Sequence, residues 1–355
     1  MKHIFVVHSP ITYLSSLGVI LTENLDLSDV LIISNGFNVK GPVKINIVNI
    51  AVNRTFSPSS MVHNLKLFYD RGYSLNITIN NFVRNEKFIA YVSVFNYLER
   101  FTVIHPNCIN FNFIEEGVES YHTSHSLSHY AISYKANFNF KKGFRGLIDR
   151  IKKCIRTFGI TEAIAAIPIF SIAYRHDESK TFYCYSNKAY PFAANKKLLN
   201  FNSIKNVFYS QDYSQNSEIS EYCIWIGGCD TFENNQLYDE FLNKYLLKFL
   251  KKESINKLLI RFHPRETKKQ RLTLTNFLDE NKIDHLPIPD ETIMELFLLN
   301  FPKTICLGLN SSLLLYSSYM GHKSISFGDQ INKQKNSRYP VYREYVEFLD
   351  ESYFL

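Results

Sequence analysis

The stretch TICLGLNSSLLLYSSYMGHKSISF, residues 304–327, holds a strand, a turn, a helix and a second strand in immediate succession. Thr304–Leu307 is a short apolar run that leads into a serine-rich turn, and Ser is a favoured residue at a helix start. The residues from Ser312 to Met320 predict a helix that Gly321 closes, and Ser324–Phe327 predicts the next strand. Two strands joined through a helix favour a parallel α/β sheet.

The same alternation runs through the rest of the chain. The other predicted strands are the apolar runs His3–His8, Val30–Ser34, Ile45–Ala51, Lys87–Val92, Ile109–Ile114, Cys223–Ile226 and Lys257–Phe262. The other predicted helices are Thr12–Leu21, Tyr238–Lys251 and Thr267–Glu280. We interpret the Asn-, Lys- and Ala-rich stretch around Ala193–Asn202 as a linker region. Two domains are therefore expected, residues 1–204 and 205–355, each a mostly parallel sheet covered by helices on both faces.

The composition is that of a globular protein with two domains of ordinary size. The chain has 355 residues, of which 45% are hydrophobic and 21% charged, so it can bury a sizeable core. Its start, MKHIFVVHSPITYL, lacks the pattern of a secretory signal. The most apolar stretch, Ala163–Ala173, is well short of the roughly 20 residues that cross a bilayer. We expect a cytoplasmic protein whose six scattered cysteines are free thiols and not zinc ligands.

One run of basic residues breaks an otherwise even charge distribution. Between Lys141 and Arg156 there are seven Lys or Arg residues against one Asp, and apolar residues recur at helical spacing in between. Two explanations stay open for this helix: a solvated face opposite an apolar stripe, or peripheral contact with the anionic inner leaflet of a membrane. Such a basic run is also found in nucleic-acid-binding proteins, but no recognised nucleic-acid motif accompanies it here.

Polar residues that directly follow buried strands are the candidates for a binding site, because ligands of open α/β sheets bind beyond the carboxyl ends of the strands. The first such place is Glu115-Glu116-Gly117, which follows Ile109–Ile114. Two adjacent carboxylates repel one another, and partial burial raises the pKa of at least one, which suits a general base. Gly117 allows a sharp turn of the backbone. The alternative is an exposed acidic turn.

The second place is His263-Pro264, followed by Arg265, after the strand that ends at Phe262. A histidine at a strand end, fixed by the next proline, is well placed to protonate or hydrogen-bond a departing phosphate. The same dipeptide also occurs as an ordinary turn, as at His105-Pro106.

The third place is Ser311-Ser312, at the start of a predicted helix. Hydroxyl groups and free backbone N–H groups at the positive end of a helix dipole form an anion site, although a simple N-cap has the same sequence. Gly227-Gly228 also follows a strand, and either lets the backbone approach a ligand or makes a tight turn.

The order of these motifs resembles that of the bacterial sialyltransferases of the GT-B fold, which act on lipooligosaccharide, O-antigen and capsule polysialic acid. Their pattern is a short acidic motif ending in Gly, a His-Pro motif, a ribose-binding glutamate and a serine pair. Here these correspond to Glu115-Glu116-Gly117, His263-Pro264, Glu295 and Ser311-Ser312. Glu291 competes with Glu295 for the ribose role, and the Glu-Glu pair departs from the commoner Asp-Asp.

The resemblance implies two Rossmann-like domains facing each other across a cleft, with the acceptor and the base on the first and the CMP-sugar on the second. The last helix of the chain can pack back on the first domain in such a fold. Glu115 is implied as the general base, with Glu116 left open as the alternative, and His263 as the general acid or phosphate partner. Ser311 and Ser312 would hold the CMP phosphate.

The expected reaction is the inverting transfer of sialic acid from CMP-sialic acid to a glycan hydroxyl, on an oligosaccharide or lipid-linked acceptor of a bacterial surface polysaccharide. No metal or other cofactor is expected, because CMP leaves as a monophosphate and no DxD-type pair follows a strand. The rivals are a CMP-Kdo transferase and a CDP-polyol phosphotransferase of the same fold. The acidic motif favours sugar transfer over phosphotransfer.

Overall fold

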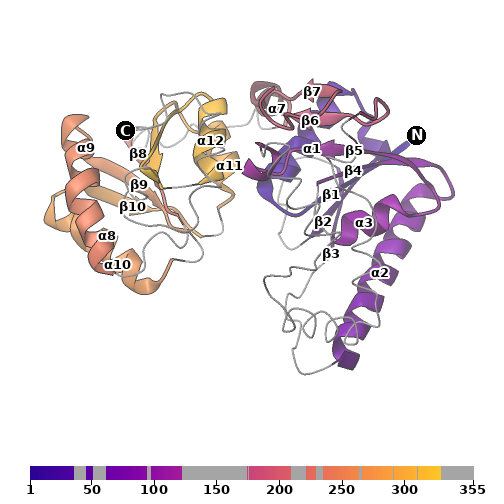
Figure 1. Ribbon diagram of the computed structural model, residues 1–355, viewed down its shortest axis with the longest axis horizontal. Helices are drawn as coiled ribbons and strands as arrows, with labels where there is room; N and C mark the ends of the chain where they lie inside the picture. Colours follow the sequence, from indigo (N-terminus) through magenta and orange to yellow (C-terminus); the bar gives the residue numbers. More distant parts are fainter. Residues whose placement is uncertain are drawn as a thin grey trace, which may run out of the picture. The chain divides into compact units, whose positions relative to one another are not determined.

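The chain forms two compact units, Met1–Ile204 and Lys205–Leu355 (Figure 1). The computed structural model describes residues 1–35, 45–50, 61–93, 97–121, 174, 176–208, 221–228, 235–263, 266–290, 292–309 and 311–328. The basic run 141–156, Pro264, Glu291 and the end of the chain, 329–355, lie outside these residues. No helix in the described part is long and apolar enough to cross a membrane.

Unit 1 is built on a seven-stranded sheet in which all neighbouring strands are parallel. The strands are β1 (Lys2–Val7), β2 (Val30–Asn35), β3 (Asn46–Ile50), β4 (Phe88–Val92), β5 (Cys108–Ile114), β6 (Phe182–Cys184) and β7 (Lys196–Leu198). Their order is β3-β2-β1-β4-β5-β6-β7. Strand β1 is central and its last four residues are buried, as expected for a strand covered on both faces.

The helices of unit 1 are α1 (Pro10–Thr22), α2 (Met61–Val83) and α3 (Tyr97–Val103), with short 3-10 segments at Leu27–Asp29 and Val118–Tyr121. Helix α1 begins in a capping box between Ser9 and Thr12, with Pro at its first position. Every residue from Ile11 to Ile20 is buried, and each fully buried large aliphatic side chain stabilises the fold by about 1.5–3 kcal/mol. Helix α7 (Phe201–Phe208) spans the boundary between the units.

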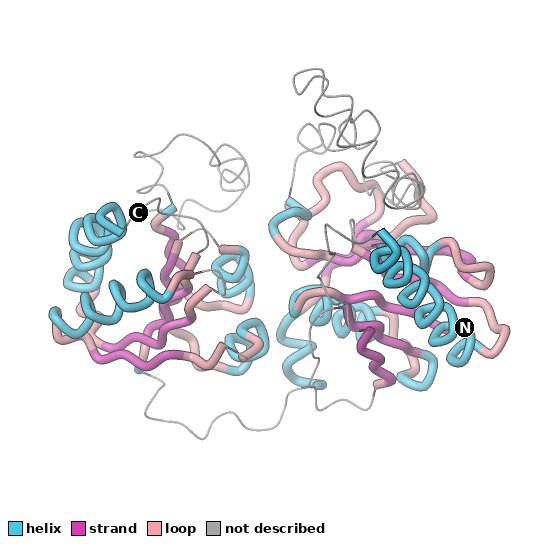
Figure 2. The backbone as a smooth tube through the Cα atoms, turned by 90° about the horizontal axis from the view of Figure 1, so that it is seen from below, coloured by secondary structure: helices cyan, strands magenta, loops and turns pink. Residues whose placement is uncertain are grey.

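Unit 2 repeats the design with five parallel strands. The strands are β8 (Cys223–Ile226), β9 (Lys257–Arg261), β10 (Asp284–Pro287), β11 (Ile305–Gly308) and β12 (Lys323–Ser326), in the order β10-β9-β8-β11-β12. The helices are α8 (Asn235–Phe241), a π-helical segment Leu242–Leu246, α9 (Leu247–Lys252), α10 (Lys268–Glu280), α11 (Met294–Asn300) and α12 (Ser312–Tyr319). Figure 2 shows helices on both faces of each sheet.

Strands β8 and β11 lie unusually close together in unit 2. A Cβ atom at Gly308 would lie 2.1 Å from the backbone oxygen of Ile226, so only glycine fits there. The fully buried Trp225 of β8 packs in the same core, with its ring 6.5 Å from that of Phe241 and 6.3 Å from that of Phe327. The centre of this sheet is therefore a tightly packed layer.

The linker predicted around Ala193–Asn202 is wrong as a structural description. The stretch contains β7 at the edge of the sheet, and Leu199 and Phe201 are buried. Asparagines and lysines are compatible with an edge strand, because such a strand is paired on one side only. The predicted helix Tyr238–Lys251 is present, but a π-helical segment interrupts it.

Candidate functional site

Both sheets have a point where the strand order reverses, and open α/β sheets bind ligands at such points. In unit 1 the reversal lies between β1 and β4, whose next residues are His8 and Ser93. In unit 2 it lies between β8 and β11, which lead into Gly227-Gly228 and toward Ser311-Ser312. The acidic motif, the glycine pair, the His-Pro motif and the serine pair therefore each follow a strand at or beside one of these two points.

The first carboxylate of the acidic pair, Glu115, is completely buried at the end of β5. Its Oε1 accepts a hydrogen bond from the Tyr121 hydroxyl at 2.9 Å, and its Oε2 accepts one from the backbone N–H of Tyr185 at 2.7 Å. The Ser15 hydroxyl of α1 donates to its backbone oxygen at 3.1 Å. Glu115 thus joins α1, the turn after β5 and the segment after β6.

The second carboxylate, Glu116, remains accessible, with 15% of its side chain exposed. Its Oε1 lies 3.4 Å from Nε2 of His8, and its backbone N–H donates to the Ser120 hydroxyl at 3.1 Å. Gly117 follows with a φ of +134°, a backbone conformation that side chains rarely adopt. The glycine therefore allows the sharp turn that follows the two carboxylates.

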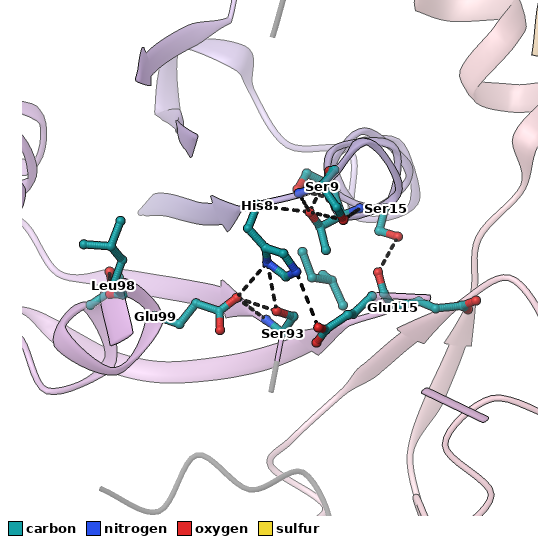
Figure 3. A network of polar contacts seen from close by, with 12 residues as sticks. His8, Ser9, Ser15, Ser93, Leu98, Glu99 and Glu115 are labelled. Atoms are coloured by element: carbon teal, nitrogen blue, oxygen red, sulfur yellow. Dashed lines mark hydrogen bonds and ion pairs between the residues drawn. The ribbon is translucent and has the colours of Figure 1, made fainter. Parts of the chain in front are cut away.

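His8 extends the acidic motif into a polar network at the reversal point of unit 1 (Figure 3). Its Nδ1 lies 3.4 Å from the Ser93 hydroxyl and 3.8 Å from Oε1 of Glu99. Glu99 belongs to α3, has 1% of its side chain exposed, and accepts from the Ser93 N–H at 2.9 Å and from the Ser93 hydroxyl at 2.6 Å. The imidazole of His8 is thus placed between two carboxylates from different elements.

His8, Ser93 and Glu99 were not among the candidate residues predicted from the sequence. A signal existed for His8, because it is the first polar residue after a buried strand and meets the same criterion that selected Glu115 and His263. Ser93 meets this criterion as well. Glu99 had no such signal, since it lies within a helix and reaches the site only through the fold.

In unit 2, His263 lies beside a carboxylate that the sequence analysis also missed. The Glu266 Oε2 atom accepts from the His263 backbone N–H at 3.1 Å, and the Glu266 N–H donates back to the His263 carbonyl at 2.9 Å. Burial raises the pKa of Glu266 to about 7, although the backbone N–H groups of His263 and Gly228 and the charge of Arg271 oppose the shift. Glu266 therefore holds the loop that presents His263.

Gly227 is required by this arrangement. A Cβ atom there would lie 2.5 Å from Glu266 Oε1, 2.8 Å from the His263 nitrogen and 3.0 Å from the Arg261 oxygen. The glycine pair after β8 thus lets two strand-end loops approach each other, a role that was not considered from the sequence.

Ser311 caps α12, with its hydroxyl accepting from the Leu313 N–H at 3.3 Å. Ser312 is the first residue of that helix, and both serines are half-buried. The pair is therefore an N-cap, and it also opens a helix N-terminus at the reversal point between β8 and β11.

Glu295 lies in the first turn of α11, and burial raises its pKa to about 6 against the favourable charge of Arg261. Arg261, the last residue of β9, donates to the Pro289 carbonyl at 2.8 Å and so fixes the loop that leads toward α11. The competing Glu291 lies outside the described residues, as does Pro264.

The predicted site residues therefore fall into two groups, one in each unit. Within unit 1 the acidic motif joins His8, Ser93 and Glu99, and within unit 2 Gly227 and Gly228 join the loop of His263. Among the described residues, no three His, Cys, Asp or Glu side chains gather in a way that could hold a metal ion.

No known family profile and no curated protein sequence matches the chain. Solved structures do match it. A 2,6-sialyltransferase of Photobacterium sp. JT-ISH-224, determined with the donor product CMP and the acceptor substrate lactose, is 11% identical; the match covers 100% of this chain and 78% of that one, with a TM-score of 0.52. The GT-B domain of a Photobacterium damselae sialyltransferase is 12% identical over 100% of this chain and 99% of that one, with a TM-score of 0.53.

A third match is a Listeria monocytogenes protein assigned as a UDP-N-acetylglucosamine 2-epimerase. It is 8% identical over 92% of this chain and 79% of that one, with a TM-score of 0.54. The chain has the GT-B fold. These likenesses and the two parallel α/β sheets confirm the predicted fold class.

Proposed function

We propose that the chain is an inverting, metal-independent sialyltransferase that moves sialic acid from CMP-sialic acid to a hydroxyl group of a glycan acceptor. A galactoside in a bacterial surface polysaccharide is the proposed acceptor. The observation that carries the proposal is the accessible carboxylate of Glu116 beside His8, at the point where the strand order of unit 1 reverses. A glycosyl transfer needs a base of this kind to activate the acceptor hydroxyl.

The second unit supplies the groups that a CMP leaving group requires. His263 follows β9, and the Ser311-Ser312 helix start follows β11, so both lie at the carboxyl edge of one sheet. An imidazole and a helix N-terminus can together stabilise a departing phosphate monoester. Glu295 is proposed to bind the ribose hydroxyls, which a carboxyl group can do in either protonation state.

The resemblance alone implied Glu115 as the base, whereas we assign this role to Glu116. Both oxygens of Glu115 already accept hydrogen bonds inside the unit, and the residue is fully buried. In the proposed step the acceptor oxygen attacks the anomeric carbon, and its proton passes to Glu116. The bond from that carbon to the CMP phosphate oxygen breaks, and its electron pair leaves on CMP.

The GT-B fold also supports other nucleotide-sugar reactions, so the experiment compares donors directly. Purified protein is incubated with lactose and, in parallel, with CMP-sialic acid, CMP-Kdo, CDP-glycerol or UDP-N-acetylglucosamine. Nucleotide release and the mass of the acceptor are followed. We expect CMP release and a sialylated acceptor only with CMP-sialic acid. Since acceptor preference is separate from donor preference, a panel of galactosides accompanies lactose. Turnover confined to another donor would contradict the proposal.

A further inference from the structure

The imidazole of His8 has a defined partner on each of its two nitrogens. Nδ1 faces Ser93 Oγ at 3.4 Å and Glu99 Oε1 at 3.8 Å, and Nε2 faces Glu116 Oε1 at 3.4 Å. Thr12 of α1 accepts the backbone N–H of His8 at 3.1 Å and fixes the chain there. The ring is therefore held between α3, the end of β4 and the acidic turn after β5.

The hydrogen bonds of Ser93 assign the tautomer of the neutral ring. The Ser93 hydroxyl donates its proton to Glu99 Oε1 at 2.6 Å, so toward His8 it offers only a lone pair. Nδ1 of a neutral His8 must then carry the hydrogen and donate it to Ser93. The lone pair on Nε2 consequently points at Glu116.

Glu99 is placed to stabilise positive charge on this ring. It is buried, and one of its oxygens accepts two hydrogen bonds from Ser93, which favours the ionised carboxylate. A negative charge close to Nδ1 and a second carboxylate at Nε2 both lower the free energy of an imidazolium at His8.

We propose that His8 is a positioning residue that relays the proton of the base: Nε2 accepts the proton that Glu116 has taken from the acceptor hydroxyl, and Glu99 stabilises the resulting imidazolium. This inference rests on the proposed function. The proton then leaves His8 to water, since the side chain is 24% exposed. The relay returns Glu116 to its ionised form for the next turnover, and the Glu116 side chain does not have to move.

The relay is tested first on the ligand-free protein, so that this readout is independent of the donor. Nitrogen NMR of the His8 ring should show hydrogen on Nδ1 in the neutral form. Glu99→Gln and Glu116→Gln should each move the midpoint of the His8 titration to lower pH, because each removes a negative charge beside the imidazolium. A titration that neither substitution moves would overturn the relay even if the enzyme transfers sialic acid.

The second test follows the pH dependence of turnover. His8→Gln should lower kcat roughly tenfold or more. It should also shift the acid side of the pH profile to lower pH, because the ionisation of the Glu116 carboxylate alone then limits activity there. His8→Ala should regain activity with free imidazole. The control is His3→Gln, which removes an imidazole in β1 that contacts the Tyr91 hydroxyl at 3.1 Å, outside the network. An active His8→Gln enzyme with the original acid side would overturn the relay, whereas a wild-type enzyme inactive with every donor would overturn the proposed function.

Discussion

Glu115 and Glu116 are adjacent in the chain, yet their side chains lie in opposite surroundings. Glu115 is buried and bonded to Tyr121 and Tyr185, whereas Glu116 is partly exposed beside His8. We expect Glu116→Gln to lower kcat by about 10²-fold or more, because the base is lost, with little change in the KM for the donor. Steady-state kinetics with saturating acceptor measures both.

Glu115→Gln is the matched comparison for this prediction. An amide nitrogen facing the Tyr121 hydroxyl or the Tyr185 N–H cannot accept their hydrogen bonds, so unfolding should become easier by about 1–3 kcal/mol. Urea unfolding followed by circular dichroism measures this loss. A folded but inactive Glu115→Gln enzyme next to an active Glu116→Gln enzyme would reverse the two roles.

Glu266 predicts how the stability of unit 2 depends on pH. The unfolded carboxyl group ionises near its ordinary pKa of 4.5, whereas burial in the folded unit raises this pKa to about 7. Between these values the folded state binds more protons, so the free energy of unfolding falls as pH rises from about 4.5 to about 7 and then levels off. The total loss is on the order of 3.5 kcal/mol, because the pKa changes from 4.5 to about 7 and each unit of pKa corresponds to about 1.4 kcal/mol.

The single tryptophan makes this effect measurable. Trp225 lies in β8, so its fluorescence reports unfolding of unit 2. Glu266→Gln stays neutral and should flatten the dependence of the urea midpoint on pH. If the urea midpoint of the variant still depends on pH as steeply as that of the wild-type protein, a group other than Glu266 causes this dependence.

At the scale of single strands, Gly308 predicts a packing effect. In Gly308→Ala the new methyl group would meet the backbone of β8, which cannot give way as a flexible side chain does. We expect a clear fall in the urea midpoint of the Trp225 transition, larger than the roughly 1 kcal/mol that separates Gly from Ala in a helix. The control is Gly72→Ala in α2 of unit 1, where the nearest atom lies 3.8 Å away and alanine favours the helix. Its urea unfolding is followed by circular dichroism, because Trp225 reports unit 2. Equal effects of the two substitutions would contradict the crowding between β8 and β11.

The central strands could be predicted from the sequence because strands buried on both faces have continuous apolar runs, as in His3–His8 and Lys257–Phe262. Strands β6, β7 and β10 could not, whereas the edge strands β3 and β12 were predicted. Strands β6 and β7 have three residues each, and β10 contains exposed positions, so none carries an apolar run long enough to stand out. Helix α2 was missed as well, since its 23 residues mix polar and β-branched positions around Gly72. These elements depend on tertiary contacts more than on local pattern.

For the whole molecule, the GT-B fold could be predicted from the sequence, and solved structures of about 11% identity share this fold. The strand-end rule also selected the acidic pair, His263 and the serine pair as candidate residues. It could not decide which carboxylate is accessible, because Tyr185 reaches Glu115 from 70 residues away. Nor could it find Glu99 or Glu266, whose roles arise from loops and helices that meet only in the folded units.

The last prediction concerns metal ions and the whole reaction. CMP leaves with one phosphate group, and the proposed partners of its charge are the His263 imidazole and the N-terminus of α12, which begins at Ser312. Two linked phosphates, by contrast, are usually bridged by a divalent cation. We therefore expect CMP release from CMP-sialic acid to continue at an unchanged rate after treatment with EDTA, and added Mg²⁺ or Mn²⁺ to have little effect. The matched control is Ser312→Ala, which should raise the KM for the donor, since a hydrogen bond to a charged group contributes about 1.5–3 kcal/mol. Strict dependence on either cation, together with an unaltered Ser312→Ala enzyme, would mean that a metal and not the helix stabilises the leaving phosphate.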